Sequence, residues 1–112
     1  MNDTDKSILE KFRSLLVERI RVHKIILFGS RARGDAQVDS DMDLLVILQD
    51  PPTEEIEDYI LDCAWKAGID HSVILVPVVY SREEWEEGPD QSSLLALAVQ
   101  REGISVYESR AR

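Results

Sequence analysis

Residues 24–48, KIILFGSRARGDAQVDSDMDLLVIL, constrain the fold more than any other part of the chain. They contain two apolar segments, 25–28 and 44–48, whose length and composition are typical of strands. Between the segments lie the pair Gly29-Ser30, a basic segment closed by Gly34, and a polar loop. The stretch therefore predicts two strands that are joined through a polar connection containing glycine.

Two acidic residues, Asp41 and Asp43, stand directly ahead of the second apolar segment. Side chains alternate between the faces of a strand, so these carboxylates are expected to project the same way, about 7 Å apart along the chain. Two anions beside a buried segment are costly unless a cation lies between them. The pattern predicts a divalent-metal site at Asp41 and Asp43.

The pair Gly29-Ser30 predicts a phosphate-binding turn at the end of the first strand. Glycine lets the backbone turn sharply and approach a ligand, which leaves backbone N–H groups and the Ser30 hydroxyl available to phosphate oxygens. Arg31 and Arg33 are expected to open a short helix with Ser30 at or near its start. A plain helix cap is the alternative for Ser30. The two arginines either neutralise phosphate or pair with surface acids.

A phosphate turn on one strand and a metal site on the next together indicate metal-assisted phosphoryl or nucleotidyl transfer. Two other motifs are excluded. A calcium loop that starts at Asp39 needs glycine at its sixth position and glutamate at its twelfth, where the chain has Leu44 and Asp50. Asp39 is therefore interpreted as a solvated loop acid. A Walker-type loop fails because no Lys-Ser or Lys-Thr pair follows the glycines.

Residues 29–34, GSRARG, and 40–46, SDMDLLV, resemble the GSxARG…SDxDLLV signature of the minimal nucleotidyltransferases, which belong to the DNA polymerase beta-like superfamily. The resemblance implies transfer of AMP from ATP to an acceptor hydroxyl, with one or two Mg²⁺ ions at the aspartates. It also implies a partner, a small helical HEPN-type toxin that such proteins neutralise as antitoxins, in some cases by attaching AMP to a tyrosine. The site residues carried over are Gly29, Ser30, Arg31, Arg33, Asp41 and Asp43.

The resemblance also implies a third carboxylate, on a strand that follows the connecting helix, where it binds metal and can accept the proton of the attacking hydroxyl. Residues 69–79 are predicted to be that strand, and Asp70 is the acid available in it. The pair His71-Ser72 departs from the apolar residues expected after such an aspartate, so a turn aspartate is the alternative. The competing function is a catalytically weak nucleotide-binding protein that inhibits a partner by direct binding.

The remaining pattern predicts an α/β fold with a mixed sheet and helices packed mainly on one face, in a single domain spanning residues 1–112. Helices are expected at 4–20, capped by Asp3 or Asp5, and from a Thr53 cap to residue 67. A capping box at residues 81–84 predicts a short helix, and Asp90 or Ser92 is expected to cap the last helix before a strand at 104–107. The site is expected at the open edge of the first two strands.

Composition limits the partners. The net charge of −9 argues against bulk nucleic-acid binding, although local arginines and a metal ion can hold a nucleotide. No apolar segment reaches the roughly 20 residues that cross a bilayer, and a cytoplasmic location is expected. Cys63 is the single cysteine and is expected on a buried helix face. Trp65 is interpreted as a partly buried edge residue, with an interface role as the alternative. A homo-oligomer is left open.

Overall fold

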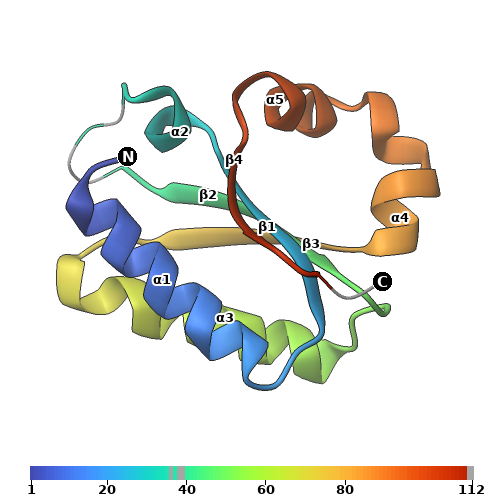
Figure 1. The fold of residues 1–112 in the computed structure, drawn as a ribbon, viewed down its shortest axis with the longest axis horizontal. Helices are drawn as coiled ribbons and strands as arrows, with labels where there is room; N and C mark the ends of the chain where they lie inside the picture. The colour runs from blue at the N-terminus through green and yellow to red at the C-terminus, as the bar shows by residue number, and fades with distance from the viewer. Residues whose placement is uncertain (36, 38–39, 111–112) are drawn as a thin grey trace.

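The computed structural model describes residues 1–35, 37 and 40–110. Its centre is a four-stranded sheet in the order β3-β2-β1-β4 (Figure 1). The strands are β1 (Val22–Phe28), β2 (Met42–Leu48), β3 (Leu75–Ser81) and β4 (Ile104–Glu108). β1 pairs antiparallel with both β2 and β4, whereas β2 and β3 are parallel. The predicted mixed sheet is confirmed.

The α-helices are α1 (Asp3–Val17), α2 (Ser30–Arg33), α3 (Glu54–Gly68), α4 (Arg82–Glu87) and α5 (Leu94–Glu102). Two 3-10 segments, η1 (Ile69–His71) and η2 (Pro89–Ser92), complete the elements. Parallel strands need a long crossover, and α3 supplies it between β2 and β3. In the part of the chain that the structure describes, no helix is both long and apolar enough to cross a membrane.

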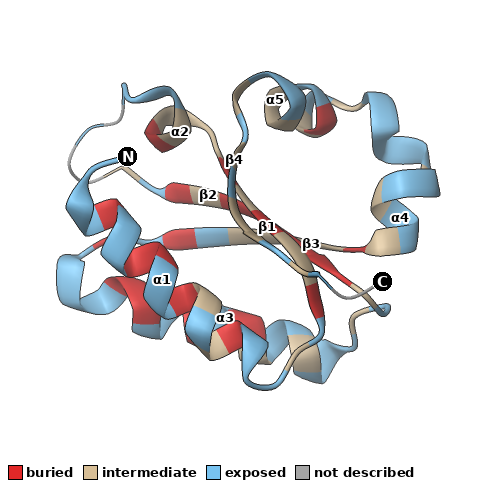
Figure 2. Cartoon of the chain, in the orientation of Figure 1, coloured by how far each residue is buried: buried red, intermediate tan, exposed pale blue. Residues whose placement is uncertain are grey.

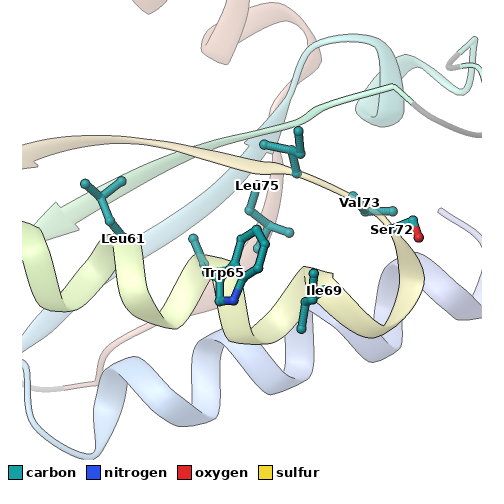
Figure 3. A pocket seen from close by; sticks show the side chains of 8 residues that line it. Leu61, Trp65, Ile69, Ser72, Val73 and Leu75 are labelled. Atoms are coloured by element: carbon teal, nitrogen blue, oxygen red, sulfur yellow. The ribbon is translucent and has the colours of Figure 1, made fainter.

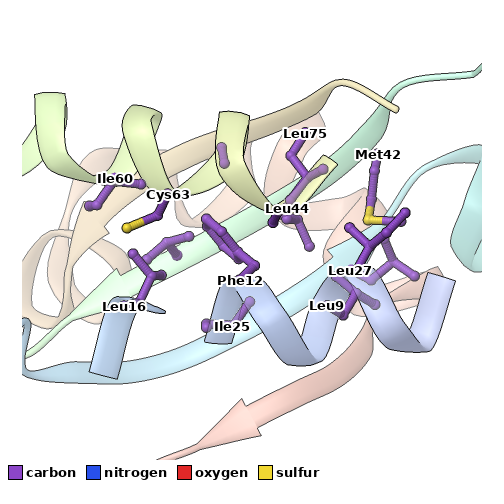
Figure 4. Close-up of a cluster of buried hydrophobic side chains, with 14 of the residues drawn as sticks. Leu9, Phe12, Leu16, Ile25, Leu27, Met42, Leu44, Ile60, Cys63 and Leu75 are labelled. Carbon is purple, nitrogen blue, oxygen red and sulfur yellow. The ribbon is translucent and has the colours of Figure 1, made fainter. Parts of the chain in front are cut away.

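The main core lies between the sheet and the two longest helices, α1 and α3. Leu44 and Val46 of β2 belong to the same buried cluster as Phe12 of α1 (Figures 2 and 4). Leu45, although fully buried, is not part of that cluster, because alternate residues of a strand face opposite sides of the sheet. Asp43 keeps step with Leu45. Its side chain therefore faces away from α1 and α3.

Two of the helix caps test the sequence interpretation directly. Thr53 caps α3, as predicted: its hydroxyl accepts a hydrogen bond from the backbone N–H of Ile56 at 3.1 Å. The expected cap of α1 is wrong, because Asn2 takes that role and its Oδ1 accepts from the backbone N–H of Asp5 at 2.8 Å. α1 also ends at Val17, short of the expected end at residue 20.

The caps of the two C-terminal helices can also be compared with those predicted from the sequence. The capping box is confirmed, since the Ser81 hydroxyl accepts from the N–H of Glu84 and the Glu84 carboxylate accepts from the N–H of Ser81. The expected cap of the last helix is wrong: Asp90 and Ser92 lie within η2, and Ser93 caps α5. The last strand extends one residue beyond its expected range.

The strand expected at residues 69–79 is wrong at its start. α3 runs directly into η1, Ser72 adopts a left-handed conformation with φ 55°, and β3 begins only at Leu75. The N–H of Val73 donates to the carbonyl of Gly68 at 3.1 Å, which closes the end of the helix. Closure of the helix end outweighs the β propensity of this stretch, so Asp70 does not lie on a strand.

Candidate active site

The Gly29-Ser30 turn is built by the end of β1 and the start of α2. Gly29 precedes α2 with φ +81°, a conformation that favours glycine, and Ser30 is the first residue of the helix. The N–H of Arg33 donates to the Gly29 carbonyl at 3.1 Å, and the N–H of Gly34 donates to the Ser30 carbonyl at 3.0 Å. The predicted short helix is thus confirmed, with Ser30 at its N-terminal end.

Asp43 lies directly against this turn. It is the second residue of β2 and stands opposite Phe28, the residue before Gly29, in the β1–β2 register. A Cβ atom added at Gly29 would collide with Oδ2 of Asp43. The carboxylate therefore occupies the space that any other residue at position 29 would need, and the acid and the turn form one site.

Asp41 adds a second negative charge to the same place. It immediately precedes β2 and is exposed to solvent. Burial raises the pKa of Asp43, and the nearby charge of Asp41 raises that pKa further. A carboxylate whose ionised form is disfavoured by a neighbouring negative charge is stabilised by a nearby cation. The structure thus brings together Asp41 and Asp43, the pair singled out in the sequence.

Arg33 lies at the rim of the site. Its guanidinium donates to Asp35 at 3.2 Å and to Glu102 at 2.8 Å, and its side chain remains 48% exposed. The positive charge of Arg33 lowers the pKa of Asp43, while the negative charge of Glu102 raises it. Arg33 therefore pairs with acids, as one alternative held, and also acts on Asp43.

Glu102 was not among the site residues predicted from the sequence. It ends α5 immediately before β4, which pairs antiparallel with β1 and places Ile104 opposite Leu27. This register carries the chain back to the Gly29-Ser30 turn from the C-terminal side. Only the pairing of β4 with β1, a contact between distant parts of the chain, places Glu102 beside Arg33.

Arg31 has a different environment from Arg33. Its side chain is 6% exposed and donates to Oδ1 of Asp5, itself buried, at 2.7 Å. It also donates twice to the carbonyl of Ser40, at 3.0 and 2.7 Å. Arg31 therefore links α1 to the residue before Asp41. The phosphate-binding role expected for Arg31 finds no support in this arrangement, because these internal contacts hold its guanidinium.

Asp70 lies apart from the two aspartates. Its side chain is 78% exposed and is 3.8 Å from the Nζ of Lys11, which belongs to α1. α1 packs on the face of the sheet opposite Asp43, so the structure does not bring Asp70 to the site. The β2–β3 register instead puts Val76 beside Asp43. The position next to Asp43 on β3 is therefore apolar.

The donor set of the site suits a hard cation held together with a nucleotide. Mg²⁺ is commonly bound by one or two carboxylates that act together with substrate phosphates, and Asp41 and Asp43 provide such a pair. Within the described ranges, no group of three or more His, Cys, Asp or Glu side chains could hold a metal by itself. Asp39 lies outside the described residues. The two aspartates fit a magnesium ion that arrives with phosphate ligands.

Residues 6–100 match the family described as the nucleotidyltransferase domain. The chain belongs to this family. A relative from Methanocaldococcus jannaschii, named as a candidate protein adenylyltransferase, is 36% identical to this nucleotidyltransferase domain over 85 residues, which cover 74% of the chain and 78% of the relative. The protein adenylyltransferase MntA of Thermococcus cleftensis is 41% identical over 59 residues, or 49% of the chain and 60% of the relative.

The chain thus spans less than two thirds of that second relative, and it spans 63% of another Methanocaldococcus jannaschii relative. Solved structures share the fold of this nucleotidyltransferase domain. A toxin–antitoxin crystal structure with AMP-PNP gives a TM-score of 0.66 at 20% identity, covering 91% of this chain and 74% of the other. The structure of a tri-AMPylated Shewanella oneidensis HEPN toxin in complex with MNT antitoxin gives a TM-score of 0.56 at 19% identity. The match covers 92% of this chain and 71% of the other.

Proposed function

We propose that this nucleotidyltransferase domain transfers AMP from ATP to a hydroxyl group of a partner protein. The observation that carries the proposal is the contact between the Asp43 carboxylate and the bare backbone of Gly29, with the charge of Asp41 close by. Phosphate oxygens at the turn and a cation at the carboxylates would lie within one small region. This arrangement suits a nucleoside triphosphate bound together with a divalent metal.

The residues of the site would have different roles in the reaction. Asp41 and Asp43 would hold Mg²⁺, which when bound neutralises charge on the phosphates and favours departure of pyrophosphate. The backbone at Gly29 and the hydroxyl of Ser30 would position the terminal phosphates. Arg33, half exposed beside Asp43, would exchange one of its carboxylate partners for a phosphate oxygen. Positioning and charge neutralisation account for most of the catalysis expected from such a site.

The acceptor is proposed to be a HEPN-type toxin, and the chain its antitoxin. Two kinds of similarity support this proposal: relatives named protein adenylyltransferases, and a shared fold with the antitoxin in a complex that contains an AMPylated HEPN toxin. Attachment of AMP to a tyrosine forms a phosphodiester with the phenolic oxygen. The bond between the α- and β-phosphates breaks, and pyrophosphate leaves with the bridging oxygen.

Labelled ATP tests the proposal. The full chain, Mg²⁺ and a HEPN-type protein are incubated with ATP labelled at either the α- or the γ-phosphate. Label from the α position should appear on the partner, and label from the γ position should not. Transfer from the γ position would indicate a kinase, and transfer from neither position would contradict the enzyme proposal.

A second function, inhibition of a partner by binding alone, is favoured by the lack, among the described residues, of a third carboxylate at the site. Asp70 lies apart from the site, and the residue beside Asp43 on β3 is Val76. A catalytically weak protein would bind nucleotide and inhibit its partner by contact alone. Tight partner binding without label transfer would favour this function. The variant Val76→Asp would then distinguish a missing carboxylate from other causes, because it adds an acid beside Asp43 and should restore transfer.

A further inference from the structure

An apolar groove lies between α3 and the outer edge of β3, away from the aspartates. Its larger part is a hollow of about 410 Å³ whose lining includes Trp65, Ile69 and Leu75. Figure 3 shows the side chains of Trp65 and Leu75 close together between α3 and β3. Three of its apolar residues are strongly exposed: Trp65 at 64%, Ile74 at 65% and Leu61 at 56%. An exposed apolar surface of this kind typically marks an interaction site.

The groove continues along β3. A second hollow of about 270 Å³ shares Leu61 with the first and is also lined by Glu57, Asp58, Pro77 and Val79. Together the two hollows follow the helical segment from Glu57 to Ile69. At the rise of an α-helix this segment is about 18 Å long. We call this combined surface the α3–β3 groove. Its length matches about three turns of a helix.

The shape of the groove favours a helix as its occupant. Leu61, Trp65 and Ile69 follow one another at intervals of four residues, which forms the kind of ridge against which a second helix packs. β3 is an edge strand, so an added strand is the main alternative. Pro77 lies in the middle of β3 and has no N–H to donate to an added strand. Strand addition is therefore disfavoured.

Charges around the groove favour a basic occupant. Glu57 and Asp58 line its smaller hollow and are exposed. Asp62 is also exposed, although Lys66 pairs with it at 2.9 Å. A second copy of the chain would bring the same acids of α3 face to face, in a protein whose net charge is −9. A partner with lysine or arginine beside its apolar face would meet these acids with opposite charge.

We propose that the α3–β3 groove docks a basic amphipathic helix of a partner protein, with its apolar face on Trp65 and Leu61 and its cations toward Glu57 and Asp58. This helix-in-groove contact is separate from the phosphate turn and does not depend on AMP transfer. Val76, which stands beside Asp43 in the sheet, is not among the residues that line the groove, because its side chain faces the side of the sheet opposite α3.

Model peptides provide the probe. An amphipathic peptide of about 18 residues, made of leucine and lysine, is titrated into the full chain without nucleotide or metal while binding is followed by calorimetry. A leucine–glutamate peptide with the same apolar face tests charge, and a scrambled leucine–lysine peptide tests amphipathicity. Only the ordered leucine–lysine peptide should bind.

Substitutions on the protein locate the binding. Leu61→Glu should weaken binding about tenfold or more, as expected when an apolar contact at the centre of an interface is replaced by a charge that must be buried. Leu94→Glu is the matched control, because Leu94 is 86% exposed on α5 and lies outside the groove. Asp58→Lys should weaken binding of the same leucine–lysine peptide, although this substitution leaves the apolar lining of the groove intact. Far-UV circular dichroism confirms that each variant is folded.

Three results would overturn the proposal. Equal binding to the Leu61→Glu and Leu94→Glu proteins would place the peptide elsewhere on the acidic surface. Equal binding of the leucine–glutamate peptide would remove the charge preference. Sedimentation that shows a wild-type dimer, converted to monomer by Leu61→Glu, would mean that a second copy of the chain covers the groove. None of these measurements depends on transferase activity, so the proposed function can fail or succeed independently.

Discussion

Asp43 has two neighbouring strands of opposite character. On the β1 side it meets the bare backbone of Gly29, with Arg33 near enough to lower its pKa. On the β3 side it meets Val76, an apolar residue that is 37% exposed. Charged ligands can therefore be stabilised on one side of Asp43 only. The comparison predicts that substitutions on the β1 side will alter nucleotide chemistry, and that substitutions beyond β3 will not.

The largest effect is expected for Asp43→Asn. Loss of one of the two carboxylates proposed to bind the metal should cost several kcal/mol of transition-state stabilisation, which corresponds to at least about a 1000-fold fall in transfer rate. Metal-dependent ATP binding, measured by calorimetry, should be lost as well. Transfer within tenfold of wild type would show that Asp43 is not the metal ligand and would remove the basis of the comparison.

The same variant makes a prediction about stability, with a sign that follows from the pKa. Burial and Asp41 raise the pKa of Asp43 in the folded protein, so folding favours its protonated form. The stabilisation is complete below the unfolded pKa and is lost as the pH rises through the raised folded pKa. At neutral pH without metal, Asp43→Asn should melt at or above the wild-type temperature. Marked unfolding of the variant would instead make Asp43 a structural residue.

Gly29→Ala should have the next largest effect, and Gly34→Ala is its matched control. Both glycines have positive φ, but Gly34 has the left-handed helical conformation, in which alanine should cost about 1–2 kcal/mol of stability, whereas Gly29, with ψ −160°, has a conformation that is nearly restricted to glycine, so alanine there should cost more. Only at Gly29 would the new Cβ collide with Asp43, whereas it would meet nothing within 4 Å at Gly34. Transfer, assayed well below both melting temperatures, should fall about 100-fold for Gly29→Ala alone. Similar losses in both variants would refute a specific role for the Gly29–Asp43 contact.

A smaller effect is expected for Glu102→Gln. The change removes a negative charge from the Asp43 region and releases Arg33 for phosphate, so nucleotide should bind up to about fivefold more tightly, as expected for an exposed ion pair. Glu86→Gln is the control, because its pair with Arg82 has a comparable distance of 3.0 Å on a different helix. Weaker nucleotide binding by Glu102→Gln would mean that Glu102 holds Arg33 in its working position.

The smallest effect is expected for Asp70→Asn. Its carboxylate is 78% exposed and near Lys11, on the face of the sheet opposite Asp43. Transfer should stay within about twofold of wild type, since only a surface ion pair is lost. A loss comparable with that of Asp43→Asn would show that η1 rearranges when nucleotide binds, and the two sides of Asp43 would no longer differ as described.

Local chemistry explains why one half of the site could be predicted. A glycine with positive φ, a helix that begins at Ser30, and two acids at alternating positions where a strand begins are all encoded within a few residues. The parts of the site that the sequence did not predict depend on how distant strands are paired. Val76 stands beside Asp43 because β3 begins five residues after Asp70, and Glu102 reaches Arg33 because β4 returns to β1. No short stretch of sequence specifies those pairings.

The same distinction applies to the two motif arginines. Both follow the turn and carry the same charge, yet Arg31 is buried and Arg33 is half exposed. Helical geometry turns residues two apart to different sides, but the sequence does not say which side is inside. The buried partner Asp5 comes from another helix. The two arginines therefore differ in burial and in the acids with which they pair.

The buried ion pair between Asp5 and Arg31 has a practical meaning for anyone who alters the start of this protein. Asp5 occupies the first turn of α1, and its partner holds the carbonyl that immediately precedes Asp41. Trimming the first residues, or fusing a tag that unwinds that turn, would remove the carboxylate partner of a buried guanidinium and weaken the support of Asp41, which is proposed to bind the metal. The first turn of α1 therefore helps to hold the segment that carries Asp41 in position.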